Sequence, residues 1–411
     1  MRGCVRPARN AAGRQGKEWD VILDLGKRPD GRRARQWHRV VGTRRDAERE
    51  RVRLLHELHT NTLPTASKLT VGEHLQRWLA DVRPGLAAQT YERYRIIVEV
   101  HLVPALGNIP LAKLSPSDVQ GYYTDAQTKP REGHDKPLAA RTVRHHHRVL
   151  RQALQHAVKL RLLAVNPAQA VEPPRPRRPE MAVLSPEQVR LLLDFSKSYS
   201  RHVPIALSLL CGLRKGEVFG LHWQDINFDA GLLHVRRSVE YPPSGPAFKE
   251  PKTARGRRRV TLPAVAIEIL REHQAAQNRL KEKVGDLYRD LGLVCCQPDG
   301  NIVRNNVKRN FDNILRALAT KILRERNPQA EKPRLPLEEL LRQAGLPRVT
   351  FHGLRHSHAT ALLVAGVNPK VVSERLGHSD VSITLGTYSH VLPDLQKEAA
   401  AKIDGLFGNG Q

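Results

Sequence analysis

The C-terminal half of the chain contains HGLRHSHA at residues 352–359 and LGHSDVSITLGTYSH at residues 376–390. In the first segment Arg355 follows His352 by three residues, a spacing that places both side chains on the same face of a helix. In the second segment Tyr388 lies 10 residues after His378 and 33 residues after Arg355. The two segments therefore bring together a guanidinium, imidazoles and a phenol, the groups that nucleophilic attack on a phosphate requires.

Two upstream segments extend this set. Residues 211–218 read CGLRKGEV and follow an apolar helix that the sequence predicts over residues 203–210. Residues 251–253 read PKT and lie in a turn between strands predicted at 232–240 and 258–262. They add Arg214 and Lys252. Attack on a phosphodiester builds negative charge on the non-bridging oxygens, and an arginine stays charged and binds two oxygens at once. One preorganised donor of this kind is typically worth about 3–4 kcal/mol.

These residue types predict distinct roles. A tyrosine hydroxyl, with an ordinary pKa of about 10, needs a neighbouring base to attack at neutral pH, and His352 is the predicted base. Lys252 would protonate the leaving 5′ oxygen, and His378 would donate a hydrogen bond to the phosphate. Taken singly, each residue also fits a surface cation, a loop histidine or a half-buried aromatic. Their order and spacing together favour one shared site. His352 and His356 have the spacing of a zinc pair, but the glutamate of HExxH is missing, so we expect no metal.

At these residues the chain resembles the tyrosine recombinases, or phage integrases. That family combines an arginine in a TGLR-GE segment, a hairpin lysine, HxxR, LGH and a tyrosine about ten residues later. This chain has Cys211 where the family often has threonine, and Gly256 where its hairpin often has serine. The resemblance implies a catalytic set with Tyr388 as nucleophile and Glu217 as support for the first arginine. The other members of the set would be Arg214, Lys252, His352, Arg355 and His378.

The resemblance also implies an activity. Tyr388 would become joined to the DNA 3′ phosphate, and a 5′ hydroxyl from another duplex would reverse the step, without ATP, metal or other cofactor. The leading function is site-specific integration and excision of a phage or other mobile element. A chromosome-dimer resolvase or a type IB-like topoisomerase would use the same chemistry. A DNA-binding regulator without catalysis is the alternative from another class.

Composition points to a nucleic-acid partner. The formal net charge of +27 over 411 residues is best neutralised by a polyanion such as duplex DNA. No apolar run approaches the roughly 20 residues that span a bilayer, so we expect no membrane partner. The N-terminus lacks the apolar stretch of a signal sequence. The four cysteines fit neither a disulfide framework nor a zinc site, and we expect a bacterial cytoplasmic, nucleoid-associated protein.

We expect a multidomain, mainly α fold with small β-sheets. Residues 1–62 would form a basic, β-rich module for arm sites on DNA, with strands at 19–26 and 35–41 and a helix at 44–59. Its first 45 residues hold 13 Lys and Arg against 4 Asp and Glu. The hairpin either reads a DNA groove or only docks on its neighbour. The remaining domains would be a helical, SAM-like core-binding domain at 68–170, a Pro/Arg linker at 171–180 and an α+β catalytic domain at 181–411.

Eight arginines are the predicted DNA contacts outside the catalytic set. Three lie in the N-terminal hairpin, three on a helix predicted over residues 141–160, and two in the linker. In that order they are Arg32, Arg33 and Arg35; Arg141, Arg144 and Arg148; and Arg177 and Arg178. The helix also carries three consecutive histidines, 145–147, which point in different directions and cannot hold one metal ion. We interpret them as part of a phosphate-facing surface.

The sequence also bears on assembly. Residues 394–406 predict a helix with Leu395, Ala399, Ile403 and Leu406 on one face. The resemblance implies that this helix packs on a neighbouring subunit in a homotetramer on DNA, while packing on its own domain is the alternative. The DNA partner would carry attachment core and arm sites. Whether a directionality factor or a host DNA-bending protein takes part stays open. Residues 319–343, rich in charge and proline, are interpreted as a peripheral, helix-containing insertion.

Overall fold

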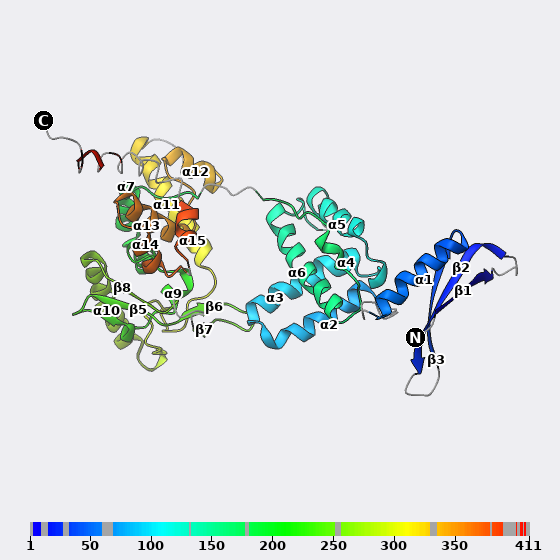
Figure 1. Cartoon of the computed structure of the whole chain (residues 1–411). Coiled ribbons are helices and arrows are strands. Elements are labelled where there is room, and N and C mark those ends of the chain that lie inside the picture. Colours follow the sequence, from blue (N-terminus) through cyan, green and yellow to red (C-terminus); the bar gives the residue numbers. More distant parts are fainter. Residues whose placement is uncertain are drawn as a thin grey trace. The chain divides into compact units, whose positions relative to one another are not determined.

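A computed structural model of the chain describes residues 3–9, 15–27, 33–59, 69–130, 133–176, 181–250, 256–328, 335–378 and 380–388, with 400, 403–405 and 407 near the C-terminus (Figure 1). The chain divides into two compact units, Met1–Arg178 and Pro179–Gln411. The helices predominate and the sheets are small, which confirms the predicted fold class. Among the described residues, none of the helices has the length and apolar character needed to cross a membrane.

The first unit begins with an antiparallel sheet in the order β1-β2-β3, covered by a helix. The elements are β1 (Gly3–Arg9), β2 (Gln15–Lys27), β3 (Arg33–Val41) and α1 (Arg44–His59). A small core between β2 and α1 contains Val21, Leu23, Ala47 and Leu54. The sequence did not predict β1, because this strand contains Pro7 and buries only Ala8 among its described side chains, which leaves no alternating pattern.

A helical part follows in the same unit. It consists of α2 (Val71–Val82), α3 (Ala88–Ile96), a π-helical turn (Ile97–Leu102), α4 (Val103–Leu106), α5 (Pro116–Thr128) and α6 (Ala140–Lys159). Thr70 and Ser115 begin α2 and α5 with capping boxes, in which the cap hydroxyl accepts a bond from the third helical amide. The helix continues through Leu106 because Pro104 stands in the first turn of α4, where no amide donor is needed.

The histidine triplet on α6 corrects one expectation. His146 and His147 are buried, and their Nδ1 atoms form hydrogen bonds with the hydroxyls of Tyr122 and Tyr123 at 2.7 and 2.9 Å. The interpretation of all three rings as a phosphate-facing surface was therefore wrong for these two. The helical repeat turns consecutive residues about 100° apart, so two rings enter the core while His145 stays among the surface arginines.

The second unit surrounds one large core with helices and two small sheets (Figure 1). Its sheets have the orders β4-β5-β8 and β6-β7. The helices are α7 (Pro186–Ser196), α8 (His202–Leu210), α9 (Lys215–Phe219), α10 (Ala264–Val284), α11 (Val307–Arg326), α12 (Leu337–Ala344), α13 (Phe351–Val364), α14 (Pro369–Leu376) and α15 (Val381–Tyr388). The strands are β4 (Ile226–Asn227), β5 (Leu232–Val235), β6 (Ser238–Glu240), β7 (Ala247–Lys249) and β8 (Arg258–Thr261).

The β-region differs from the prediction in one respect. The strand expected over 232–240 is two strands, of which β5 pairs with β8 and β6 pairs with β7. Strand β7 was not predicted, because its three residues are too few for a periodic pattern. The predicted turn at 251–253, with Lys252, lies outside the described residues.

The stretch 319–343 is not peripheral, which corrects a second expectation. Helix α11 runs through its first part to Arg326, and α12 packs against α11. Ala319, Leu340 and Leu341 are buried in the main core of the unit. The charged and proline-rich composition concealed this, because an amphipathic helix buries only one stripe of its residues.

Candidate active site

Glu217 is the centre of the candidate site. Its carboxylate accepts two hydrogen bonds from Arg258, at 3.0 and 2.8 Å, and one from Arg214 Nη1 at 2.8 Å. Arg355 Nη1 lies 4.0 Å from the same carboxylate. Glu217 also accepts a bond from the backbone amide of Arg214, which makes Arg214 the N-terminal cap of α9. One buried carboxylate thus draws together three arginines from α9, β8 and α13.

Backbone carbonyls fix the direction of the two predicted catalytic arginines. Arg355 donates to the carbonyl oxygens of Gly212 and Leu376 at 2.7 and 2.6 Å, and Arg214 donates to that of Gly377 at 3.0 Å. Gly212 has a φ of +67°, and a Cβ on it would lie 2.7 Å from the ring of His358. Only glycine fits there without strain, so the turn between α8 and Arg214 depends on it. These bonds tie α13, the end of α14 and the 211–214 turn together.

The electrostatics leave a positive excess at the site. Burial alone would raise the pKa of Glu217, but the hydrogen bonds and charges of Arg258 and Arg214 outweigh burial and lower this pKa to about 2. Burial and the nearby charge of Arg214 lower the pKa of Arg355 to about 9, so its guanidinium is still charged at neutral pH. Three cations therefore face one carboxylate, and an anion such as a phosphate would offset the remainder.

Tyr388 ends α15 beside these arginines. Its ring is 1% exposed and packs against Ala359, Leu363 and Leu376. Its hydroxyl forms a hydrogen bond of 2.7 Å with Nδ1 of His356. Burial raises the pKa of Tyr388 to about 12, although the charge of Arg355 acts in the opposite direction. The phenol is therefore protonated at neutral pH, and its partner is His356 rather than the predicted base.

The other two predicted histidines lie nearby. The ring of His352 reaches the surface and contacts the ring of His356 edge-on, with 4.8 Å between centroids. His378 forms a bond of 2.8 Å between Nδ1 and the hydroxyl of Thr384. Desolvation, followed by the charges of Arg355 and Arg214, lowers the pKa of both histidines, that of His378 to about 4. Both rings are neutral at neutral pH.

The structure therefore brings five of the six predicted catalytic side chains into one region, and Lys252 lies outside the described residues. Sequence reasoning missed Arg258 and the contact made by His356. Arg258 lies two residues before the buried Val260 in β8, and the strand alternation could have placed it on the core face. No sequence signal pairs it with Glu217, 41 residues earlier. His356 was noted only as half of a zinc spacing.

The predicted DNA contacts fall into three groups. Arg141, Arg144 and Arg148 lie exposed along one face of α6 and, with desolvation and Arg93 of α3, lower the pKa of His145. Arg33 and Arg35 are exposed on β3, where Arg33 pairs with Asp24 at 3.4 Å. The remaining three, Arg32, Arg177 and Arg178, lie outside the described residues.

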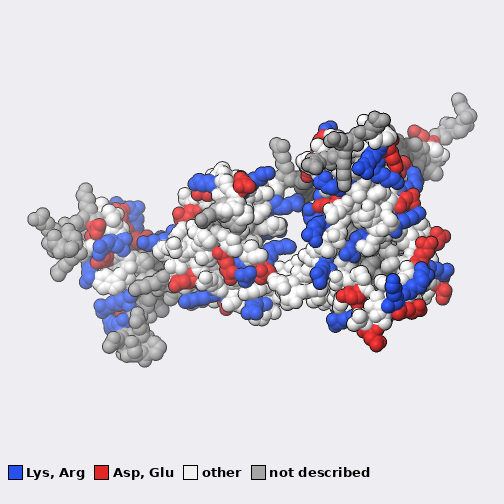
Figure 2. Space-filling model, turned by 180° about the vertical axis from the view of Figure 1, so that it is seen from behind, with Lys and Arg blue, Asp and Glu red and all other residues white. Residues whose placement is uncertain are grey.

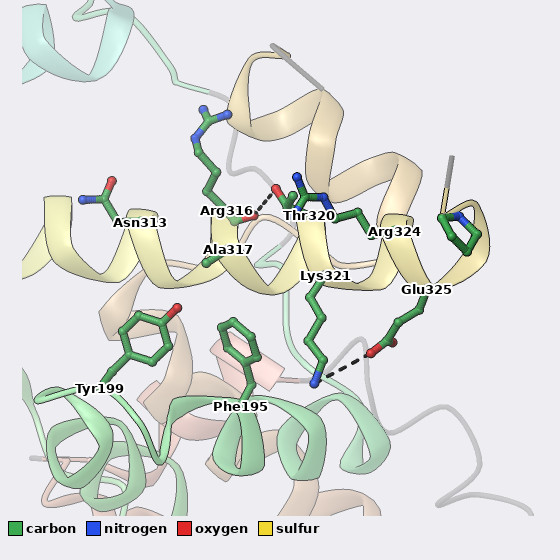
Figure 3. A pocket seen from close by; sticks show the side chains of 10 residues that line it. Phe195, Tyr199, Asn313, Arg316, Ala317, Thr320, Lys321, Arg324 and Glu325 are labelled. Atoms are coloured by element: carbon green, nitrogen blue, oxygen red, sulfur yellow. Dashed lines mark hydrogen bonds and ion pairs between the residues drawn. The ribbon is translucent and has the colours of Figure 1, made fainter. Parts of the chain in front are cut away.

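The second unit also contains two notable pockets, of which the first borders the Glu217 cluster at Arg258. One, of about 870 Å³, lies among β5, β7 and β8 and is rich in arginine, with lining residues that include Arg236, Arg237, Arg257 and Arg259. The other, of about 670 Å³, lies between α7 and α11. Phe195 and Tyr199 line it on one side and Arg316 and Arg324 on the other (Figure 3). Lys and Arg are interspersed with Asp and Glu on one face of both units, so overall charge does not single out one surface (Figure 2).

Replacing Glu217 with Gln should destabilise the second unit in a pH-dependent way. The folded pKa of Glu217 lies below its unfolded value, so its stabilisation is present above about pH 4.5 and is lost as the pH falls towards 2. We expect a loss of roughly 3 kcal/mol at neutral pH, because the arginines lose their counter-charge. Hydrogen exchange of peptides from α9 and β8 would measure it. A loss of equal size at pH 7 and pH 3 would contradict the assignment.

Comparison with known proteins agrees with this geometry. Residues 182–394 match the phage integrase family, and residues 70–126 match the phage integrase N-terminal SAM-like domain. A XerC-like tyrosine recombinase of Caldanaerobacter subterraneus is 26% identical, over 96% of this chain and 98% of the relative. An integrase of Streptomyces ambofaciens is also 26% identical, over 96% of this chain and 95% of the relative.

Solved structures show the same fold. The Tn1549 transposon integrase in complex with a circular intermediate DNA has a TM-score of 0.62 at 20% identity, covering 82% of this chain and 99% of that one. A lambda integrase tetramer bound to a Holliday junction has a TM-score of 0.53 at 16% identity, covering 88% and 94%. The family match spans more than half of the 411 residues and contains the whole arginine–tyrosine cluster. The chain therefore belongs to the phage integrase family of tyrosine recombinases, enzymes that cleave and rejoin DNA.

Proposed function

We propose that this recombinase integrates and excises a phage or other mobile element by site-specific strand exchange, with Tyr388 as nucleophile. The observation that carries the proposal is the convergence of Arg214 and Arg355 on the Glu217 carboxylate, with Tyr388 close enough to Arg355 for its pKa to respond to that charge. Relatives that match nearly the whole chain are named integrases, from Streptomyces ambofaciens and, as a prophage integrase, from Escherichia coli. The N-terminal sheet favours an integrase over a chromosome-dimer resolvase or a type IB-like topoisomerase, because a basic module ahead of the helical domain supplies a second DNA-binding surface.

In the proposed reaction the phosphate lies between Arg214 and Arg355, whose charges offset the negative charge that develops on its oxygens. In the tautomer with its proton on Nε2, His378 accepts from Thr384 at Nδ1 and can donate from Nε2 to the phosphate. A histidine takes the phenolic proton as Tyr388 Oη attacks the phosphorus, and the sequence predicts His352 for this role. The bond to the 5′ oxygen breaks, and Lys252 gives that oxygen a proton. A 5′ hydroxyl from the partner duplex later reverses the step.

A nicked duplex that carries the core site should trap wild-type protein as a covalent adduct, because the released strand diffuses away before religation. Tyr388→Phe should form no adduct and still bind the duplex. Tyr288→Phe is the matched control, since that tyrosine is also partly buried in the second unit and bonds to Cys296. Denaturing gel electrophoresis would measure the adduct. Its absence from the wild-type protein on its own site would refute the enzyme and favour the DNA-binding regulator.

We propose two described surfaces for the DNA backbone outside the reacting phosphate. One is the exposed arginine face of α6, where none of the ion pairs found among described residues involves Arg141, Arg144 or Arg148. The other is the arginine-rich pocket at β5, β7 and β8. Both present guanidinium groups that fit phosphate oxygens. Arg177 and Arg178 of the linker would follow the backbone between them.

The triple change of Arg141, Arg144 and Arg148 to Ala should weaken binding to all duplexes alike. Each lost phosphate contact should reduce the slope of log affinity against log salt by about 1, so the triple variant should lose about 3. Arg342→Ala is the control, because that guanidinium pairs with Glu339 on α12. Fluorescence anisotropy over a salt series would give the slopes. An unchanged slope in the triple variant would exclude this face as a DNA contact.

The domain roles follow from this arrangement. Residues 1–62 would bind arm sites with the exposed Arg33 and Arg35 of β3, together with Arg32. Residues 68–170 would bind the core site, and the catalytic domain at 181–411 would cleave it. The 171–180 linker would connect the two halves. Four subunits would assemble on two duplexes, and a directionality factor and a host DNA-bending protein would be compatible with the separate arm and core sites.

We further propose that the C-terminal tail docks on a neighbouring subunit. Ile403 and Phe407 of the tail are 54% and 77% exposed, so these apolar side chains are available to another surface. The pocket between α7 and α11 offers the aromatic rings of Phe195 and Tyr199 with arginines at its rim (Figure 3). Apolar side chains of the tail would cover those rings, and its acidic residues would approach Arg324.

Deletion of residues 394–411 should abolish tetramer formation on DNA and leave binding of one subunit to a half-site unchanged. Arg324→Glu at the pocket rim should weaken the tetramer in the same way, because it removes charge complementarity to the tail. Lys283→Glu on α10 makes an equal change of charge outside the pocket and should have no effect. Light scattering of the DNA complex would measure the assembly. A tetramer that survives the deletion would show that the tail packs on its own domain.

A further inference from the structure

We infer that His356, and not His352, is the residue that positions the Tyr388 hydroxyl and accepts its proton during DNA cleavage. The inference rests on the proposed function, because it assigns a step in that reaction. Its basis is a short hydrogen bond to the reacting atom itself: His356 Nδ1 lies 2.7 Å from Tyr388 Oη.

The geometry makes His356 the residue between the phenol and the other histidines. It lies on α13 one residue after Arg355, and its ring centroid is 5.8 Å from that of Tyr388. The ring of His352 contacts the ring of His356 edge-on, with an interplanar angle of 90°, and among the described contacts the hydroxyl of Tyr388 bonds to His356 and not to His352. His356 is half-buried, whereas His352 reaches the surface. A proton that leaves Tyr388 along its existing hydrogen bond arrives at His356.

The charges around His356 keep it neutral in the DNA-free protein. The groups that face it are His352 and Arg355 on its own helix, Tyr388 on α15 and His378 after α14. Burial, followed by His352 and Arg355, lowers the pKa of His356 to about 4. The neutral ring has one unprotonated nitrogen, and in the tautomer with its proton on Nε2 that nitrogen is Nδ1, which accepts from the phenol. The phenol keeps its proton because its own pKa is raised to about 12.

DNA binding changes this balance. A phosphodiester beside Arg355 supplies a negative charge, which offsets the cation that disfavours protonated His356 and so raises its pKa. The same phosphate also offsets the charge by which Arg355 favours the phenolate, so a free phenolate does not accumulate. The seated phosphate therefore favours His356 as the group that holds the proton while Tyr388 Oη bonds to the phosphorus.

DNA cleavage transfers the phosphorus from the 5′ oxygen to Tyr388 Oη. The Tyr388 Oη–phosphorus bond forms while the phosphorus–O5′ bond breaks. The phenolic proton moves to Nδ1 of His356, and the leaving 5′ oxygen takes a proton from Lys252. In the reverse step His356 returns its proton to the phenol as the 5′ hydroxyl attacks. No oxidant, metal or nucleotide takes part.

The test compares His356→Asn, His356→Ala and His352→Asn in single-turnover adduct formation on the nicked core duplex across pH. Asparagine keeps an acceptor near the Nδ1 position but cannot take a proton. We expect His356→Asn to slow adduct formation about 100-fold, the size typical of general base catalysis, with DNA affinity unchanged. His356→Ala should be slower still, because it also loses the positioning bond. His352→Asn should retain the rise of rate with pH that both His356 variants lose.

A substrate with sulfur in place of the bridging 5′ oxygen separates base from acid. The thiolate leaves without a proton, so this substrate should restore Lys252→Ala and leave His356→Asn slow. Histidine NMR provides a readout independent of activity. In Tyr388→Phe protein, a bound core duplex should move the titration of His356 to higher pH.

Three outcomes would overturn the inference. They are wild-type rates in His356→Asn, rescue of that variant by the sulfur substrate, and loss of the pH dependence in His352→Asn alone. No upward shift of the His356 titration with DNA would overturn the activation by phosphate. Absence of any adduct from wild-type protein would instead refute the proposed function, and the inference with it.

Discussion

The second unit depends on a single buried ion cluster, the Glu217 carboxylate with Arg214, Arg258 and Arg355. A buried carboxylate is costly unless it is paired and hydrogen-bonded, and here guanidinium and backbone donors satisfy both oxygens. The carboxylate also serves the arginines, since the buried Arg258 and Arg355 could not lie together in the interior without a counter-charge. Stability and substrate binding are therefore linked, because the cluster keeps a positive excess that a phosphate can neutralise.

The cluster also determines where the nucleophile lies. Arg355 donates hydrogen bonds to the carbonyl oxygens of Gly212 and Leu376, and these bonds connect α13 to the end of α14. The chain continues from there to α15, which ends at Tyr388. The same helix presents His356 to the phenol. A protonated tyrosine against a neutral imidazole is a resting arrangement. In the proposed reaction this arrangement changes when a phosphate lies beside Arg355.

The surface shows how a large positive charge is distributed. On the face that Figure 2 shows, Lys and Arg occur on both units and are interspersed with Asp and Glu. Within the described chain, many arginines pair with a glutamate three residues away on the same helix, as Arg95 does with Glu92 and Arg342 with Glu339. Such exposed pairs contribute little to stability. The arginines of α6 and of the pocket at β5, β7 and β8 are therefore more informative about DNA than the total charge.

The sequence by itself determined the family, the mainly α fold class and five of the residues that lie together in the candidate site, because each short motif has a fixed local spacing and their order along the chain is specific. Local patterns also predicted the helices found as α1, α6 and α8. Only the tertiary structure decided which groups touch. In the folded chain Arg258 pairs with Glu217, and the hydroxyl of Tyr388 forms its hydrogen bond with His356 rather than with His352. His146 and His147 are buried, and each bonds to a tyrosine hydroxyl. These contacts join residues 24 to 41 positions apart, and no local pattern encodes them, because each depends on how whole helices and strands pack around a core.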